Sequence, residues 1–302
     1  MSPSYLRRLT SRYRESAYSD HVWSRRVAGA AGALTAAVSL SGCGHIDELN
    51  YQPLTTPQEW CIQRPCIDVG DLVVAEPTSS VLVFTLALLW IGVGLAFLLG
   101  RHDQRSRMWF GASLILGGVA AGSAGISYQA FSYELKCAGR EACTLTNGFE
   151  IAYSLLQVGS FSAMVVAVAW ALAGLRVRRG ISIYAVVNLV VYVAITVVGV
   201  IVPSALLLSF EVLLLFAVPA LVMVAVLAWS QRRTMLGRRV LWVLILLVGV
   251  QVAYLIYFAS GLTASFWASG VYFSANDVLH VGMVAWLITT WLLLRGPLRD
   301  RP

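Results

Sequence analysis

Seven long runs of apolar residues divide the chain, and short polar segments separate them. The runs lack the apolar–polar alternation of membrane strands. A run of about 20 apolar residues is long enough to cross the hydrocarbon core as a helix, which satisfies its own backbone hydrogen bonds in lipid. The pattern therefore predicts an all-α bundle of seven transmembrane helices. The runs cover residues 81–100, 108–131, 151–175, 181–202, 206–230, 240–260 and 278–294.

Composition excludes a water-soluble globular protein. Of the 302 residues, 58% are hydrophobic and only 12% are charged, whereas soluble domains carry about a quarter charged residues. Two prolines interrupt the pattern. Pro203 separates the fourth and fifth runs, and Pro219 lies inside the fifth run, where we expect it to kink the helix.

The distribution of basic residues predicts the orientation of the bundle. Of the 22 Lys and Arg residues, 19 lie in residues 1–26 or in the segments that follow the first, third, fifth and seventh runs. Because basic residues concentrate in cytoplasmic loops, the bundle should begin outside and end in the cytoplasm. The other side receives Arg64, Lys136 and Arg140 together with 11 of the 15 acids. The net charge of +7 is then a topological signal, and we expect no nucleic-acid partner.

The first 42 residues have the order of a secretory signal peptide: an Arg-rich stretch, a modest apolar run and small residues. Leu40-Ser41-Gly42-Cys43 resembles a bacterial lipobox. That resemblance implies cleavage before Cys43, a lipid on its sulfur, and a multi-pass protein of the bacterial cytoplasmic membrane. The alternative is an uncleaved eighth helix that ends near Cys43. The predicted organisation is a signal peptide at 1–42, an extracytoplasmic segment at 43–79, the seven-helix domain at 80–295 and a cytoplasmic tail at 296–302.

All five cysteines fall on the predicted outer side, where disulfides persist. With Cys43 lipidated, the other four residues form two pairs without remainder, either locally or crossed, and the sequence does not choose between these pairings. The spacing within the pairs and the absence of ordered neighbouring histidines make a metal site a poor alternative, so we expect none. The disulfide candidates are Cys61, Cys66, Cys137 and Cys143.

Polar residues follow helical spacing inside the apolar runs, mostly toward their outer ends. Glu150, Ser154, Gln157 and Ser160 share one helix face, and Asn276, Asp277 and His280 share another. Ionisable groups at membrane depth are costly and mark sites by default. The alternative is that these groups bond one helix to another. We predict an outward-facing polar pocket for a small ligand, cation or proton. Its candidate residues are Glu134, Glu150, Gln157, Glu211, Asn276, Asp277 and His280.

Two seven-helix families offer comparisons. The stretch from Asp277 to Gly282, Asp-Val-Leu-His-Val-Gly, resembles the last helix of microbial rhodopsins with one residue fewer and without the lysine that carries retinal. Lys136 is the sole lysine and lies in a predicted outer loop, so a retinal Schiff base is excluded. The layout also resembles the membrane hydrolases that include alkaline ceramidases and adiponectin-type receptors. That family binds zinc through three histidines. Since His280 is the only histidine here within a predicted span, the three zinc ligands of that family are missing.

The Asn-Asp-Val-Leu-His start of the last helix also resembles uncharacterised bacterial seven-helix proteins, a resemblance that implies no activity. The chain contains no phosphate loop, nucleophile elbow or haem motif, and we expect no cofactor.

Three functional hypotheses remain. The first is a receptor, sensor or proton- or cation-linked binder of a small molecule or lipid. The second is a lipid hydrolase with Asp277 and His280 as acid and base. The third is a transporter. Expected partners are membrane lipid and a small ligand or cation, and the sequence is compatible with an oligomer.

Overall fold

The computed structural model describes residues 46–101 and 103–301. Among these residues, seven helices are long and apolar enough to span a membrane, which confirms the predicted helical bundle. Their bounds are α4 Pro77–Leu99, α5 Arg105–Ala124, α7 Gly148–Leu172, α8 Leu175–Ile201, α9 Phe210–Ser230, α10 Met235–Ser260 and α12 Ala275–Leu294. Cys43 and the predicted signal peptide lie outside the described residues.

The helix starts differ from the apolar runs by several residues because polar caps, rather than hydropathy, set them. The side chains of Asn147, Ser209, Thr234 and Ser274 accept hydrogen bonds from the first turns of α7, α9, α10 and α12. Such caps satisfy backbone N–H groups that have no partner within the helix. Pro219 lies inside α9, as the sequence predicted.

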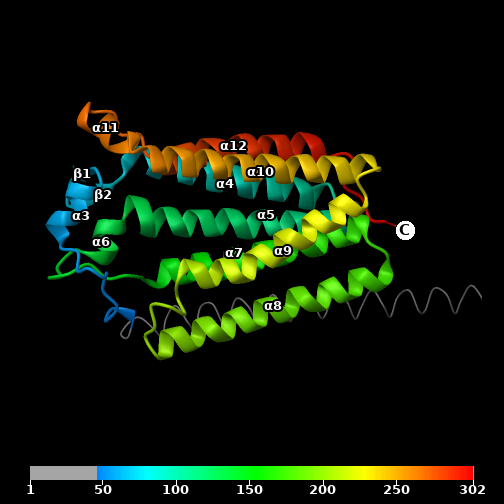
Figure 1. The fold of residues 1–302 in the computed structure, drawn as a ribbon, viewed down its shortest axis with the longest axis horizontal. Coiled ribbons are helices and arrows are strands. Elements are labelled where there is room, and N and C mark those ends of the chain that lie inside the picture. Colours follow the sequence, from blue (N-terminus) through cyan, green and yellow to red (C-terminus); the bar gives the residue numbers. More distant parts are fainter. Residues whose placement is uncertain (1–45, 102, 302) are drawn as a thin grey trace, which may run out of the picture.

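Six of the helices form a closed ring. Following the contacts, α4 packs on α5, α5 on α7, α7 on α9, α9 on α10, α10 on α12, and α12 returns to α4. Helix α8 lies outside this ring against α7 and α9 (Figure 1). The first and last helices of the bundle are therefore neighbours.

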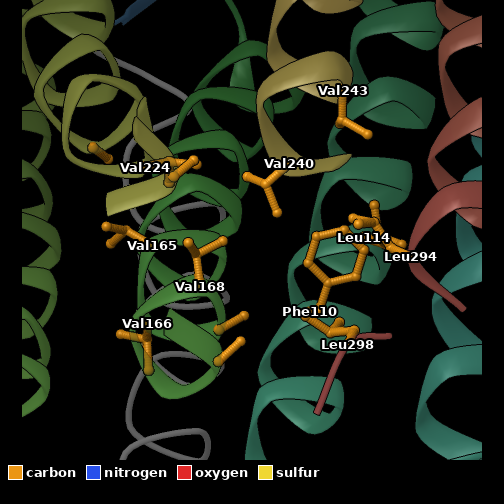
Figure 2. Packing of buried hydrophobic residues seen from close by; sticks show 14 of the residues in the cluster. Phe110, Leu114, Val165, Val166, Val168, Val224, Val240, Val243, Leu294 and Leu298 are labelled. Carbon is orange, nitrogen blue, oxygen red and sulfur yellow. The ribbon is translucent and has the colours of Figure 1, made fainter. Parts of the chain in front are cut away.

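The interior of the ring is filled by apolar side chains from several helices (Figure 2). Phe110 and Leu114 of α5, Val165 of α7, Val224 of α9 and Val240 of α10 belong to one buried cluster. Because lipid is as apolar as these side chains, close van der Waals packing rather than the hydrophobic effect holds the helices together.

Helices α4 and α5 approach so closely that only glycine fits between them. A Cβ atom on Gly111 would lie 2.7 Å from the carbonyl oxygen of Gly94, and Gly118 and Gly125 are similarly crowded by side chains of α4. The three glycines of the second span are spaced by seven residues and so share one face. Beyond α5 the span continues as the π-helical segment η1 (Gly125–Ala130), followed by α6 (Ser132–Lys136).

A small cap covers one end of the bundle. It contains helix α3 (Pro57–Gln63) and an antiparallel hairpin of β1 (Cys66–Val69) and β2 (Leu72–Ala75), in which Cys66 pairs with Ala75. The hairpin is an addition to the all-α prediction. Its four-residue strands are too short for a clear alternation, and Gly70, with a φ of +65°, allows the tight turn between them.

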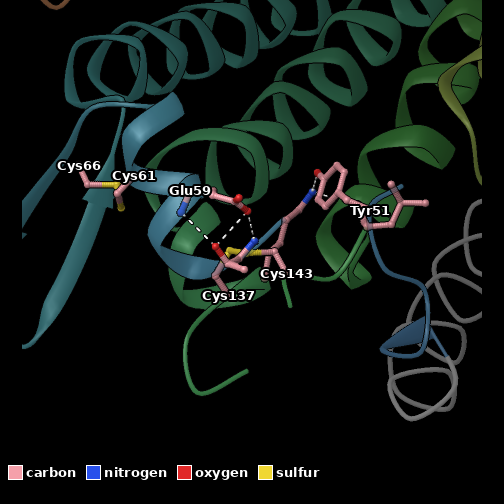
Figure 3. Close-up of a disulfide and its surroundings, with 9 residues drawn as sticks. Tyr51, Glu59, Cys61, Cys66, Cys137 and Cys143 are labelled. Carbon is pink, nitrogen blue, oxygen red and sulfur yellow. Dashed lines mark hydrogen bonds between the residues drawn. A yellow bond between two sulfur atoms is a disulfide. The ribbon is translucent and has the colours of Figure 1, made fainter. Parts of the chain in front are cut away.

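Both predicted disulfides form, and both are local. Cys61 pairs with Cys66, and Cys137 pairs with Cys143. The two bonds belong to one cluster with Trp60 and Tyr133 at the cap end (Figure 3). This pairing resolves the choice that the sequence left open.

The arginine-rich segments gather at the opposite end, where the chain also ends (Figure 1). The C-terminal tail folds back there: the Asp300 carboxylate accepts hydrogen bonds from the backbone N–H groups of Arg105 and Ser106 at the start of α5. Leu298 is buried in the core, and the Arg107 guanidinium donates to its carbonyl oxygen. The arginines of these segments are Arg101, Arg105, Arg107, Arg176, Arg178, Arg179, Arg232, Arg233, Arg238, Arg239, Arg295, Arg299 and Arg301.

Candidate functional site

The predicted pocket residues lie toward the cap end of the bundle, but their contacts divide them into separate groups. Glu150 lies in the first turn of α7, Glu211 lies in the first turn of α9, and the first two turns of α12 contain Asn276, Asp277 and His280. Each group is formed by a different pair of segments.

The first group is a buried ion pair. The Lys136 ammonium lies 2.5 Å from the Glu150 carboxylate, and the two residues are 0% and 5% exposed. Lys136 also donates to the hydroxyl of Tyr51 at 2.9 Å and to the carbonyl oxygen of Leu145 at 3.1 Å. An ammonium has three protons, and all three are used here.

The remaining contacts of this ion pair fasten α7 to η1. Ser127 donates to Glu150 at 2.7 Å, and the Asn147 amide donates to Ser127 at 2.7 Å. The aromatic rings of Tyr51, Tyr128 and Trp60 lie within 6 Å of the ammonium. Because every proton of Lys136 has a partner, Glu150 belongs to a structural lock between the cap and the bundle rather than to an open pocket.

The second group joins α12 to α4. One Asp277 oxygen accepts a hydrogen bond from the backbone N–H of Ser274 at 2.5 Å, and the other accepts one from the Ser79 hydroxyl at 2.8 Å. The Ser79 and Ser274 hydroxyls are 3.1 Å apart. Asp277 is 0% exposed and acts as the third residue of a capping box. We call Ser79, Ser274 and Asp277 the α4–α12 knot.

A further link lies on the side of this knot that faces the cap. The Asn276 amide donates to Glu76 at 3.3 Å, and Glu76 lies 3.8 Å from the Arg64 guanidinium. Burial raises the pKa of the Glu76 carboxyl above its ordinary value of 4.5, and the nearby Arg64 charge opposes this rise. The cap thus contacts both α4 and α12 through one buried carboxyl group.

His280 lies one turn below Asp277 on α12 and is the least satisfied of the predicted site residues. Its side chain is 7% exposed, and its Nδ1 atom is buried without a hydrogen-bond partner among the described residues. Buried polar atoms without partners are uncommon and call for an explanation. Within the described structure Asp277 and His280 are not hydrogen-bonded to each other, so they do not form an acid–base pair here.

The other three predicted residues have separate surroundings. Glu134 accepts a hydrogen bond from the backbone N–H of Val73 at 2.8 Å and so holds strand β2. Glu211 is exposed in the first turn of α9, and Gln157 is half-buried on α7. In residues 46–101 and 103–301, no three His, Cys, Asp or Glu residues are grouped so that they could hold a metal ion.

Sequence reasoning missed Ser79, Glu76 and the structural role of Lys136. The capping box was recognisable, because Ser274 precedes Asp277 by three residues at the start of an apolar run. No local signal identifies Ser79 as the partner of Asp277, since 198 residues separate them.

Comparison with known proteins adds no relative: no family model matches the chain, and neither a curated protein nor a solved structure shows significant similarity to it.

Proposed function

We propose that this integral membrane protein is a sensor or receptor that responds to a proton, cation or small ligand at the outer end of α12. The observation that carries the proposal is the buried His280 imidazole, whose Nδ1 atom has no partner among residues 46–101 and 103–301, one turn below the α4–α12 knot. Ionisable residues inside membrane spans are functional by default, and a ring nitrogen of an imidazole can bind a proton or a metal cation.

The position of His280 suggests how binding is transmitted. A positive charge at His280 competes for the carboxylate of Asp277, which now holds the Ser79 hydroxyl and the Ser274 backbone N–H. Weakening these bonds loosens α12 from α4. The other titratable groups that the helices packed on α12 bring to this end are Tyr254 and Tyr257 of α10 and Glu76 at the start of α4.

The two ends of the bundle support an outward-facing site. The disulfides lie at the same end as the knot, and disulfides persist in oxidising, extracytoplasmic compartments. The arginine-rich segments lie at the other end, which is typical of the cytoplasmic side. A bacterial inner-membrane location and a lipid anchor on Cys43 remain part of this proposal.

The test is a pH titration of tryptophan fluorescence in lipid nanodiscs. Trp286 of α12 and Trp90 of α4 lie 5.8 Å apart between ring centroids and report on the contact between these helices. We expect a pH-dependent transition in the wild type and its loss in His280→Gln. Trp286→Phe should remove most of the change in fluorescence that accompanies this transition.

Native mass spectrometry of the same samples tests for a bound ligand. A small molecule that is retained by the wild type and lost in His280→Gln would identify the ligand class. If His280→Gln titrates as the wild type does and the two variants carry the same bound species, the proposal is wrong.

A further inference from the structure

A hollow in the cap exposes one of the two disulfides. Its volume is about 350 Å³, and it is open to the outside. Cys61 and Cys66 line it together with Gln58, Asp68 and Tyr133. The bond joins the end of α3 to the start of β1 at the edge of the cap (Figure 3).

The second disulfide has the opposite surroundings. Cys137 and Cys143 are both 0% exposed, packed beneath Trp60, whereas Cys61 and Cys66 are only half-buried. Thiol–disulfide exchange requires a thiolate to reach a sulfur atom, so its rate depends on access. The same molecule therefore carries an accessible disulfide and an inaccessible one in neighbouring positions.

We propose that the Cys61–Cys66 disulfide is a thiol-exchange site for small thiols that enter this hollow. A thiolate attacks one sulfur, so that the Cys61–Cys66 bond breaks, a mixed disulfide forms and the other cysteine leaves as a thiolate. A second thiolate attacks the mixed disulfide and releases the oxidised small disulfide. Two thiols are thereby oxidised, the protein disulfide is reduced, and the protons of the two thiols pass through water to the two cysteines.

The charge around the hollow selects among thiols. Asp68 lines the hollow, and Asp71 and Glu59 are also on the cap. The described cap residues 46–76 include six acidic residues and one basic residue, Arg64. The site should therefore react faster with a thiol that carries an ammonium group than with one that carries a sulfonate.

Exchange at this site has a defined structural consequence. Arg64 lies inside the short loop that the Cys61–Cys66 bond closes, and it is the ion-pair partner of Glu76 at the start of α4. Reduction releases this loop and so weakens a contact between the cap and the bundle. The inference is independent of the role proposed for His280.

The experiment uses the full chain in lipid nanodiscs and follows both disulfides in one sample. The protein is treated with cysteamine, 2-mercaptoethanol or mercaptoethanesulfonate, free thiols are alkylated at successive times, and the peptides are quantified by mass spectrometry. We expect Cys61 and Cys66 to be alkylated at least about tenfold faster than Cys137 and Cys143. Cysteamine should exceed mercaptoethanesulfonate by about threefold or more after correction for thiolate concentration.

Asp68→Asn is the variant that tests the charge argument, and Asp47→Asn, in the cap but outside the hollow lining, is its matched control. Asp68→Asn should reduce the preference for cysteamine, and Asp47→Asn should leave it unchanged. Equal alkylation rates for the two disulfides, or no alkylation of Cys61 and Cys66 before the protein unfolds, would overturn the proposal. A cysteamine preference that survives in Asp68→Asn would overturn the assignment of the hollow as the route of entry.

Discussion

At the scale of single residues, Lys136 and His280 are two basic side chains in opposite situations. Lys136 is fully buried, and each of its three protons has an acceptor. His280 is nearly as buried, yet its Nδ1 atom has no partner in the described structure. A buried charge is tolerated only with partners, so the fold depends on the groups that surround Lys136. The unpartnered Nδ1 atom is the reason why we propose His280 as the responding group.

The Lys136–Glu150 pair predicts a large loss of stability when one member is removed. Glu150→Gln leaves the ammonium without its counter-charge in a buried position, and we expect a loss of about 3–5 kcal/mol in the free energy of unfolding. Denaturant unfolding in mixed micelles measures this change. The matched control is Glu211→Gln, because Glu211 is exposed at a helix start, and it should cost no more than about 1 kcal/mol.

The double variant Lys136→Met/Glu150→Leu distinguishes a lost ion pair from damage to packing. It removes both charges, so it should recover a substantial part of the stability lost in Glu150→Gln. A double variant as unstable as the sum of the two single variants would contradict the interpretation.

The buried Glu76 carboxyl predicts that stability depends on pH in the opposite direction to that expected for an ordinary ion-paired acid. Since burial raises its pKa in the folded protein, folding favours the protonated form. Its contribution to stability is therefore greatest at or below about pH 4.5 and is lost as pH rises through the raised pKa. Glu76→Gln does not titrate, so its stability relative to the wild type should increase as pH is raised from 4 to 7.

Thermal unfolding of both proteins across this range measures the difference. A difference that is constant with pH would show that the Glu76 pKa is the same in the folded and unfolded states.

At the scale of elements, the contact between α4 and α5 depends on the absence of side chains. Gly94 on α4 and Gly111 on α5 face each other, and a Cβ atom on either would meet backbone within 2.8 Å. Backbone atoms do not move aside as the end of a flexible side chain does. Close approach through small residues is the common means of holding membrane helices together.

Gly111→Ala should therefore separate these helices and destabilise the protein by about 1–3 kcal/mol, despite the higher helix propensity of alanine. The control is Gly92→Ala on α4, where an added Cβ meets nothing within 4 Å, and this change should be neutral or stabilising. Unfolding in mixed micelles compares the two variants. Equal stabilities for the two would show that the helices can shift at little cost.

At the scale of the whole molecule, the two ends of the bundle are closed by different means. Disulfides and a buried ion pair hold the cap at one end. At the other end, the Asp300 carboxylate of the C-terminal tail accepts hydrogen bonds from two N–H groups of α5. The residue at the N-cap position of this helix, Gln104, provides no side-chain cap. A carboxylate at this position also interacts favourably with the helix dipole.

Asp300→Ala removes these two hydrogen bonds at the start of α5, and we expect a loss of about 1–2 kcal/mol in the free energy of unfolding. Hydrogen exchange at the amides of Arg105 and Ser106 should increase, whereas exchange in the cap around Cys137 should not change. Unaltered exchange at Arg105 and Ser106 would show that the tail does not protect the start of α5.

The sequence supports prediction of some of these features and not of others. Hydropathy predicts the seven spans because each is decided by about 20 consecutive residues. The four disulfide cysteines and the arginine-rich segments are also predictable as local patterns, but the pairing of the cysteines is not. The sequence predicts an outer loop at Lys136. Its burial is not predictable, because it depends on Tyr51 and Glu150, which belong to other segments of the chain. His280 was recognised as a candidate, but its lack of a partner is visible only once the helices are packed.

The contact between α4 and α12 closes the ring, because it joins the first and the last of the six helices in chain order. Ser79 with Asp277, Trp90 with Trp286 and Phe97 with Trp291 hold it together. Since α12 follows the other five helices of the ring in the chain, the ring stays open on that side until α12 has been synthesised. During biogenesis the face of α4 that carries the Ser79 hydroxyl therefore lacks its partner, α12, for longer than any other contact surface in the ring.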